Sequence, residues 1–153
     1  MMRCWTQLRG MRRPLAALLL SLCLLVVAAC SRTPPEQRLR EQIGRMQAAL
    51  EQRQARAFID GVAEDFTGNG GMDRAALQQA VRAQVLANAD IGLTLGPAQI
   101  ELQGDRATVR FSALATGGGG RLLPDRASGW QVTSGWRDED GQWLLYYAEW
   151  KPL

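Results

Sequence analysis

The spacing of apolar residues changes once along the chain, near Asp90, and this change limits the possible folds. Before Asp90, apolar residues recur every three or four positions, as on one face of a helix, beginning with Leu39, Ile43, Met46 and Leu50. After Asp90 they alternate with polar residues, as in strands buried on one side. Helices followed by closely connected strands predict an α+β fold, in which the helices cover one face of an antiparallel sheet.

Three helices are predicted in the first part. The first begins with a capping box, in which Thr33 is the N-cap, Pro34 is the first helical residue and Glu36 follows three positions after the cap. A second helix is predicted over 58–66, and a third begins at Asp73, which we expect to cap it. The expected inward residues of the second and third helices are Phe58, Ile59, Val62, Ala63, Phe66, Leu77, Val81 and Val85.

The alternating part predicts five strands separated by turn residues. Gly104-Asp105 and Asp140-Gly141 have the composition of hairpin turns, and 117–120 is a run of four glycines. The predicted strands cover 91–95, 98–102, 106–116, 128–137 and 142–151.

The first thirty residues have the pattern of a bacterial lipoprotein leader. Four arginines precede an apolar stretch, Leu15–Ala29, which is shorter than the ~20 residues of a membrane-spanning helix. Val27-Ala28-Ala29-Cys30 resembles the lipobox, in which the cysteine is acylated, for example with palmitate, after cleavage of the preceding bond. We therefore predict a signal peptide over 1–29 ending at Ala29, an acylated Cys30 with a short tether over 30–35, and a single domain over 36–153.

This leader predicts the location of the protein. Acyl chains on Cys30 would hold the domain on a lipid bilayer in the cell envelope. Ser31, rather than an aspartate, follows the cysteine, and by the sorting rule for such lipoproteins this indicates the outer membrane, facing the periplasm.

Composition excludes several classes of site. The chain has no histidine, so a Ser-His-Asp group, a Cys-His pair and an imidazole zinc site are impossible. The three cysteines, Cys4, Cys23 and Cys30, all lie in the first thirty residues, which leaves the domain without a free thiol, as suits an oxidising compartment. Removal of the four leader arginines from 18 basic residues leaves 14 against 15 acidic residues, a formal charge of −1. Nucleic acid is therefore not an expected partner.

Several short motifs accompany the predicted order of helices and strands. They are Arg53-Gln54-Ala55-Arg56-Ala57, Glu64-Asp65-Phe66, the stretch from Asp65 to Arg74, the stretch from Trp136 to Trp143, and Ala148-Glu149-Trp150. With that order, they resemble the nuclear transport factor 2-like superfamily over roughly residues 36–151. The resemblance implies a curved sheet wrapped around helices to form a cone, a fold that hosts isomerases, dehydratases, binding modules and oligomerisation domains.

The catalytic groups of that superfamily do not carry over by motif. Its isomerases use a carboxylate base with a tyrosine on the first helix, whereas the only tyrosines here, Tyr146 and Tyr147, fall in the last predicted strand. Its dehydratases rely on histidine. Asp60, Asp65 and Glu101 remain as weak candidates for a general base.

No cofactor or metal site is expected. Against the calcium-binding EF-hand template, the loop that begins at Asp65 has Ala76 where a bidentate glutamate belongs, so Asp73 is better explained as a helix cap. The glycines at 68–70 lack the third glycine of a dinucleotide fingerprint, because Asp73 stands in its place. The glycine run at 117–120 lacks the lysine of a phosphate loop.

Aromatic residues are the most distinctive set in the predicted sheet. In the last strand, alternation predicts Trp143, Leu145 and Tyr147 on one face, and Leu144, Tyr146 and Trp150 on the other. With apolar residues on both faces, one face would meet the helices and the other a partner or a cavity. The candidate pocket or interface residues are Phe111, Trp130, Trp136, Trp143, Tyr147 and Trp150.

Three functions stay open, in this order of preference. The first is a non-catalytic domain that contacts another envelope protein or a second copy of itself through an exposed aromatic sheet face. The second is a binder of a small apolar ligand or lipid inside the cone. The third is an isomerase- or dehydratase-like enzyme.

The predicted anchor can be tested by replacing the acylated residue. Cys30→Ser is expected to abolish labelling by a palmitate analogue and to prevent the chain from being processed as a lipoprotein. Cys23→Ser, within the predicted leader, is the matched control and should be labelled normally. Equal labelling of both variants would contradict the assignment of Cys30.

Overall fold

The computed structural model describes residues 33–118 and 126–153, the side chain of Arg126 excepted. The predicted signal peptide, Ala29, Cys30 and the start of the tether lie outside the described residues. Residues 34–153 form one compact unit with its own core, and no helix among the described residues is long and apolar enough to cross a membrane. A unit with its own core can be studied as an isolated domain.

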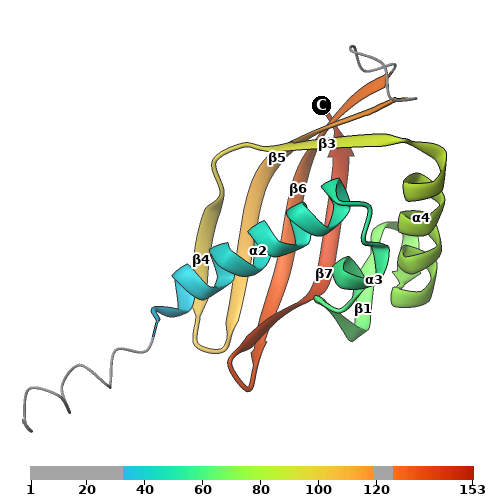
Figure 1. Cartoon of the computed structure of the whole chain (residues 1–153). Coiled ribbons are helices and arrows are strands. Elements are labelled where there is room, and N and C mark those ends of the chain that lie inside the picture. Colours follow the sequence, from blue (N-terminus) through green and yellow to red (C-terminus); the bar gives the residue numbers. More distant parts are fainter. Residues whose placement is uncertain (1–32, 119–125) are drawn as a thin grey trace, which may run out of the picture. The chain divides into compact units, whose positions relative to one another are not determined.

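The helices precede most of the strands, as predicted (Figure 1). In the first half of the chain, α2 (Pro35–Glu51), α3 (Ala55–Ile59) and α4 (Arg74–Ala87) alternate with β1 (Val62–Gly68), the 3-10 turn Asn69–Gly71 and β2 (Met72–Asp73). The remainder comprises β3 (Asp90–Leu95), β4 (Gln99–Gln103), β5 (Arg106–Gly118), β6 (Arg126–Glu139) and β7 (Gln142–Pro152).

The strands form one curved sheet in the order β2-β1-β7-β6-β5-β3. β4 and β3 pair successively with the two halves of β5, while β6 pairs with β5 along most of its length. The pairings are antiparallel except between β1 and β7, which are parallel. α2 lies across the concave face of this sheet, and the α+β cone fold predicted from the sequence is confirmed.

The second predicted helix is wrong beyond Ile59. The chain turns at Gly61, where a side chain would lie 2.7 Å from both Gln42 Nε2 and Met46 Sδ. Residues 62–68 then pair with β7 as strand β1. Val62, Phe66 and Thr67 favour strands, and the exposed edge of β7 offers partners for their backbone groups, so tertiary pairing overrides the helical spacing.

The first helix begins one residue later than predicted, and no side chain caps it. Pro34 has φ −51° and ψ 142°, because the following Pro35 excludes the helical conformation at Pro34. Glu36 does not bond back to the cap; its carboxylate accepts from Arg40 Nη2 at 2.7 Å. The cap of α4 is as predicted, since Asp73 Oδ1 accepts from Ala76 N at 2.7 Å.

The core lies at the end of the cone where α2 begins. Leu39, Val109 and Trp143 are at most 1% exposed. Trp143 Nε1 donates to Pro35 O at 3.0 Å, and Arg38 pairs with Asp138 at 2.7 Å, so the start of α2 is fixed to the β6–β7 hairpin. At the other end of α2, Gln47 Nε2 donates to Leu93 O and Glu51 Oε1 accepts from Leu93 N, which covers the free edge of β3.

Truncation of Leu39 tests whether this end of the cone is the stabilising core. Leu39→Ala in residues 34–153 is expected to lower the free energy of unfolding by about 2–5 kcal/mol, because it opens a cavity in a fully buried site. Leu86→Ala, the same change at a helical side chain that is 82% exposed, should change it by less than about 0.5 kcal/mol. Urea unfolding measures both, and equal losses would contradict this location of the core.

Candidate functional site

A pocket of about 400 Å³ lies between the helices and the concave face of the sheet. We call it the deep pocket. Its size falls within the ~300–1,000 Å³ typical of small-molecule sites. It is lined by Ile43, Met46, Gln47 and Leu50 of α2, Phe58 of α3, Phe66 of β1, Leu77 and Val81 of α4, Leu93 and Leu95 of β3, Phe111 and Ala113 of β5, Trp130, Val132, Ser134 and Trp136 of β6, and Leu145, Ala148 and Trp150 of β7.

The deep pocket exists because side chains become smaller along β5. The inward residues run Ala107, Val109, Phe111, Ala113, Ala115 and Gly117, and the first two are buried in the core. Beyond Phe111 only alanine and glycine face inward, so the space between β5 and the helices is not filled. The sizes of the inward side chains along β5 therefore determine which end of the cone is filled and which is left open.

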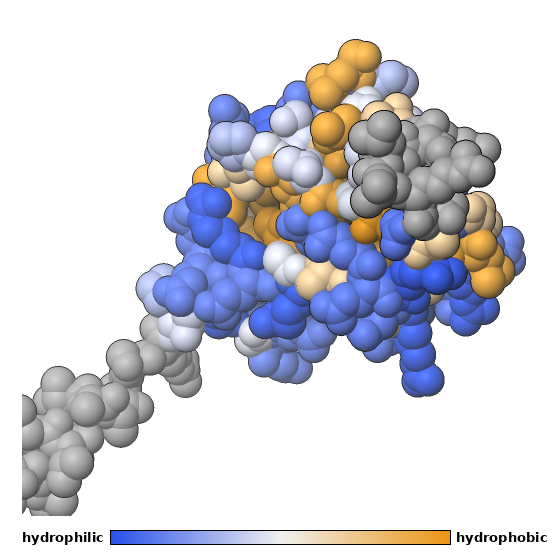
Figure 2. Space-filling view, turned by 45° about the horizontal axis from the view of Figure 1, so that its top comes forward, coloured by the Kyte–Doolittle hydropathy of each residue, from blue (hydrophilic) through white to orange (hydrophobic). Residues whose placement is uncertain are grey.

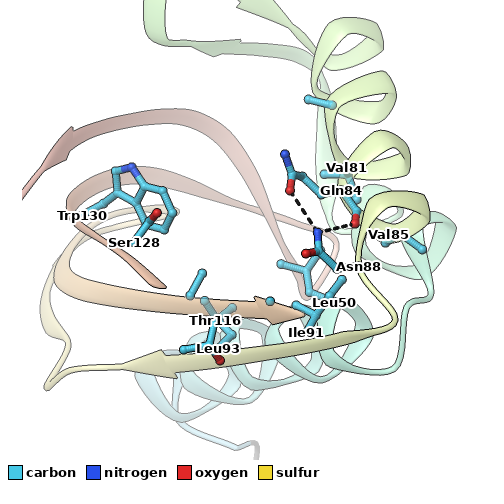
Figure 3. A pocket seen from close by; sticks show the side chains of 13 residues that line it. Leu50, Val81, Gln84, Val85, Asn88, Ile91, Leu93, Thr116, Ser128 and Trp130 are labelled. Atoms are coloured by element: carbon cyan, nitrogen blue, oxygen red, sulfur yellow. Dashed lines mark hydrogen bonds between the residues drawn. The ribbon is translucent and has the colours of Figure 1, made fainter. Parts of the chain in front are cut away.

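A second pocket, of about 490 Å³, lies beside the C-terminal ends of α2 and α4 and is drawn in Figure 3. We call it the mouth pocket. It shares Leu50, Val81, Leu93 and Trp130 with the deep pocket. Its other lining residues are Ala80, Gln84, Val85, Asn88, Ile91, Ala115, Thr116, Gly117 and Ser128. Figure 2 shows hydrophobic side chains gathered in the upper half of the view and hydrophilic ones over the lower half.

Three polar side chains of the deep pocket, Ser134, Trp136 and Gln47, are hydrogen-bonded to the protein. Ser134 Oγ donates to Val109 O at 3.2 Å and accepts from Trp136 Nε1 at 3.0 Å. Gln47 Nε2 donates to Leu93 O at 2.7 Å. No aspartate, glutamate, lysine, arginine or tyrosine is among the described residues that line either pocket. The described part of the lining therefore supplies no carboxylate, ammonium or phenol as a general acid or base.

The three carboxylates considered as bases lie outside the cone. Asp60 is exposed and lines a separate outer groove beside α2 and α3. Glu101 is exposed on β4 and pairs with Arg110 at 2.6 Å. Asp65, on β1, accepts from both Nη atoms of Arg137 at 3.0 and 3.1 Å.

The electrostatics of Asp65 also disfavour a role as a base. The hydrogen bonds from Arg137 lower the pKa of Asp65 below its ordinary value of 3.8, and the paired carboxylates of Asp65 and Glu139 raise the pKa of Arg137. A general base working near neutral pH needs a raised carboxyl pKa. The Asp65–Arg137 pair is therefore a surface ion pair that joins β1 to β6.

The loop tested for calcium uses its polar groups in the fold. Asn69 Nδ2 donates to Trp150 O at 2.6 Å and Asn69 Oδ1 accepts from Trp150 N at 3.0 Å, while Asp73 caps α4. Asp65 is held by Arg137. Within residues 33–118 and 126–153, no group of three or more histidine, cysteine, aspartate or glutamate side chains could hold a metal ion.

The faces predicted for the last strand are wrong beyond Leu145. Gly135 pairs with Tyr147 but Trp136 pairs with Leu145, so Tyr146 is the extra residue of a β-bulge. The bulge reverses the alternation: Ala148 and Trp150 face the cone, whereas Tyr147 is 37% exposed and bonds Glu149 on the outside. The Tyr146 ring lies beneath Arg106 and Arg137, whose guanidinium carbons are 5.6 and 5.7 Å from its centre.

The aromatic residues predicted as a pocket or interface are thus divided. Phe111, Trp130, Trp136 and Trp150 line the deep pocket, Trp143 is buried in the core, and Tyr147 lies on the outer surface. The sequence analysis did not assign the helical contributors, among them Ile43, Met46, Phe58 and Val81, to a site. Their apolar spacing was visible, but it does not distinguish a side chain that lines a pocket from one that fills a core.

Comparison with known proteins shows which family and which solved structures share this fold. The family described as the SnoaL-like domain matches residues 41–148. No curated protein sequence matches the chain. Structural similarity extends to Bd1075 from Bdellovibrio bacteriovorus, with a TM-score of 0.68 and 14% identity over 76% of this chain, which spans only 41% of that one.

Two further solved structures cover more of their own length. A protein of unknown function with a cystatin-like fold from Nostoc punctiforme has a TM-score of 0.64 and 20% identity, over 77% of this chain and 90% of that one. A candidate scytalone dehydratase from Novosphingobium aromaticivorans has a TM-score of 0.69 and 17% identity, over 77% and 83%. Similarity at these identities shows the fold alone.

The ion pair between Asp65 and Arg137 predicts the pH at which the carboxyl of Asp65 titrates. The carboxyl of Asp65 should titrate below pH 3.8 in the folded domain, and Arg137→Gln should move its midpoint back toward that value. Because the folded-state pKa is lowered, the pair's stabilising effect is complete above the ordinary pKa and is lost as pH falls through the folded one.

Carboxyl carbon NMR measures this titration. Lys151→Gln, which removes the partner of Glu149 instead, should leave the Asp65 midpoint unchanged. An Asp65 midpoint at or above the ordinary value in the unsubstituted domain would contradict the assignment.

Proposed function

The chain belongs to the SnoaL-like family, and we propose that its cone binds a small apolar molecule without catalysing a reaction. The observation that carries this proposal is the lining of the deep pocket. It is about 400 Å³ in volume and mostly apolar, and its Ser134, Trp136 and Gln47 side chains already bond to protein atoms. A ligand with strongly polar groups would lose hydration there and find few partners.

The contents of the cone weigh against the enzymatic alternative. An isomerase or dehydratase moves protons and needs an ionisable side chain near its substrate. Asp60, Asp65 and Glu101 all lie on outer surfaces, and the described lining of both pockets has no ionisable group. The candidate scytalone dehydratase shares the fold of this chain, but that similarity assigns no catalytic residue to the cone.

The alternative hypothesis, an interaction domain, required an exposed aromatic sheet face, and most of those aromatic residues are not on the outer surface. Of the six aromatic residues proposed for a pocket or interface, only Tyr147 lies on the outer face. The outer face instead carries the Arg110–Glu101, Arg137–Asp65 and Lys151–Glu149 pairs. Such exposed pairs typify a hydrated surface.

The leader supports a location for this binding domain. Acylation of Cys30 would hold it on the envelope membrane, with the outer membrane favoured by Ser31. An apolar ligand is poorly soluble in water, so a binding domain beside a bilayer would be close to a source of such molecules.

Filling the deep pocket tests the proposal. Ala113→Leu places three more carbon atoms beside Phe111 and Trp130 and is expected to weaken binding of the neutral fluorescent probe N-phenyl-1-naphthylamine to residues 34–153 by about tenfold or more, equivalent to about 1.4 kcal/mol. Leu114→Phe adds bulk to the next residue, which points outward and is 46% exposed, and should leave probe binding unchanged. Circular dichroism confirms that both variants fold.

Two results would contradict the proposal. One is the absence of saturable probe binding to the unsubstituted domain. The other is equal binding by the two variants, which would place the probe outside the cone.

A further inference from the structure

The deep pocket and the mouth pocket adjoin each other, and their linings differ in polarity. They share Leu50 of α2, Val81 of α4, Leu93 of β3 and Trp130 of β6. On three elements, the lining residues run from the deep pocket to the mouth pocket. Those of β6 are Trp136, Ser134, Val132, Trp130 and Ser128, those of β5 are Phe111, Ala113, Ala115 and Gly117, and those of α2 are Met46 and then Leu50.

Besides Gln47 and Ser134 in the deep pocket, the polar side chains lie at the mouth. They are Gln84 of α4, Asn88 directly after α4 and Ser128 of β6, and Thr116 of β5 borders them with its hydroxyl on Gly92 O (Figure 3). Asn88 Nδ2 donates to Gln84 O at 2.9 Å and, more weakly, to Gln84 Oε1 at 3.4 Å. Within the described part of the chain, Gln84 Nε2, Asn88 Oδ1 and the Ser128 hydroxyl have no hydrogen-bond partner.

The hydrogen-bonding groups that the described residues contribute to the mouth are all uncharged. Amide and hydroxyl groups can donate to or accept from a neutral polar group. A carboxylate or an ammonium at this position would meet no opposite charge among the described lining residues, whereas a neutral head needs none.

We propose that the ligand is an uncharged amphipath, with its apolar chain in the deep pocket and a neutral hydroxyl or amide head at Gln84 and Ser128. This rests on the proposed function, since it assumes that the cone binds an apolar molecule. It adds the orientation of the ligand and the chemical class of its head group. Trp130, which lines both pockets, lies beside the point where the apolar chain of the ligand joins its head group.

Three ligands with the same twelve-carbon chain length test the head group. Monolauroylglycerol, laurate and dodecyltrimethylammonium are neutral, anionic and cationic, and each is titrated below its micellar concentration against N-phenyl-1-naphthylamine bound to residues 34–153 at pH 7. The neutral ligand is expected to bind about tenfold or more tightly than either ion. Equal or tighter binding of an ion would overturn the head-group assignment.

Variants at the mouth test the orientation. Gln84→Leu and Ser128→Ala should each weaken binding of monolauroylglycerol by about three- to tenfold, as expected for loss of a hydrogen bond. Neither variant should weaken binding of the probe, which has no such head group. Gln79→Leu, the same change at an exposed α4 residue outside both pockets, is the control and should bind both molecules normally.

The outcomes separate this inference from the proposed function. Probe binding without a preference for the neutral head, or without an effect of Gln84→Leu and Ser128→Ala, overturns the ligand class and leaves the apolar site intact. Absence of probe binding to the unsubstituted domain overturns both.

Discussion

Packing of α2 against the concave face of the sheet is the interaction on which the rest of the structure depends. At its first turns the space is filled, since Leu39 and Trp143 are almost completely buried and the indole of Trp143 bonds Pro35 O. At its last turns Leu50 instead borders both pockets. One helix thus closes one end of the cone and leaves the other open, because the facing residues of β5 shrink to alanine and glycine. Core and pocket overlap along this layer, since Met46, Phe66 and Trp136 belong to the buried core and also line the deep pocket.

A single extra residue in β7 determines which aromatic side chains reach this space. Tyr146 forms a bulge opposite Gly135, where any side chain would lie 2.8 Å from the tyrosine ring. Without the bulge, Tyr147 would face the cone and Ala148 and Trp150 would face outward. With it, Trp150 joins Trp130 and Trp136 on the concave face, and the outer surface is left to tyrosine rings, arginines and carboxylates. The bulge therefore directs Trp150 into the cone and leaves Tyr147 on the outer surface.

The sequence predicted the fold class and most element positions because periodicity reports which face of an element is buried. It placed α4, its Asp73 cap and the five later strands, whose hydrophobic alternation is unambiguous. It mistook β1 for a helix, because Val62, Ala63 and Phe66 satisfy helical spacing and only the edge of β7, far along the chain, makes a strand preferable. It also placed Trp150 on the wrong face, since a bulge adds a residue without any local signal. Whether an inward alanine such as Ala113 fills a core or borders a pocket depends on what faces it, which periodicity does not report.

The absence of histidine excludes several kinds of catalysis by residue type. The structure adds a second restriction, which is the position of the carboxylates. Carboxylates are present, but those considered as bases are held on outer strands or an exposed turn. The direct measurement is a crystal structure of residues 34–153 soaked with 1-bromododecane, with bromine located by its anomalous scattering. The account predicts the ligand between α2 and β6, beside Trp130 and Phe111. Bromine found only on the outer surface, with ordered water filling the cone, would contradict it.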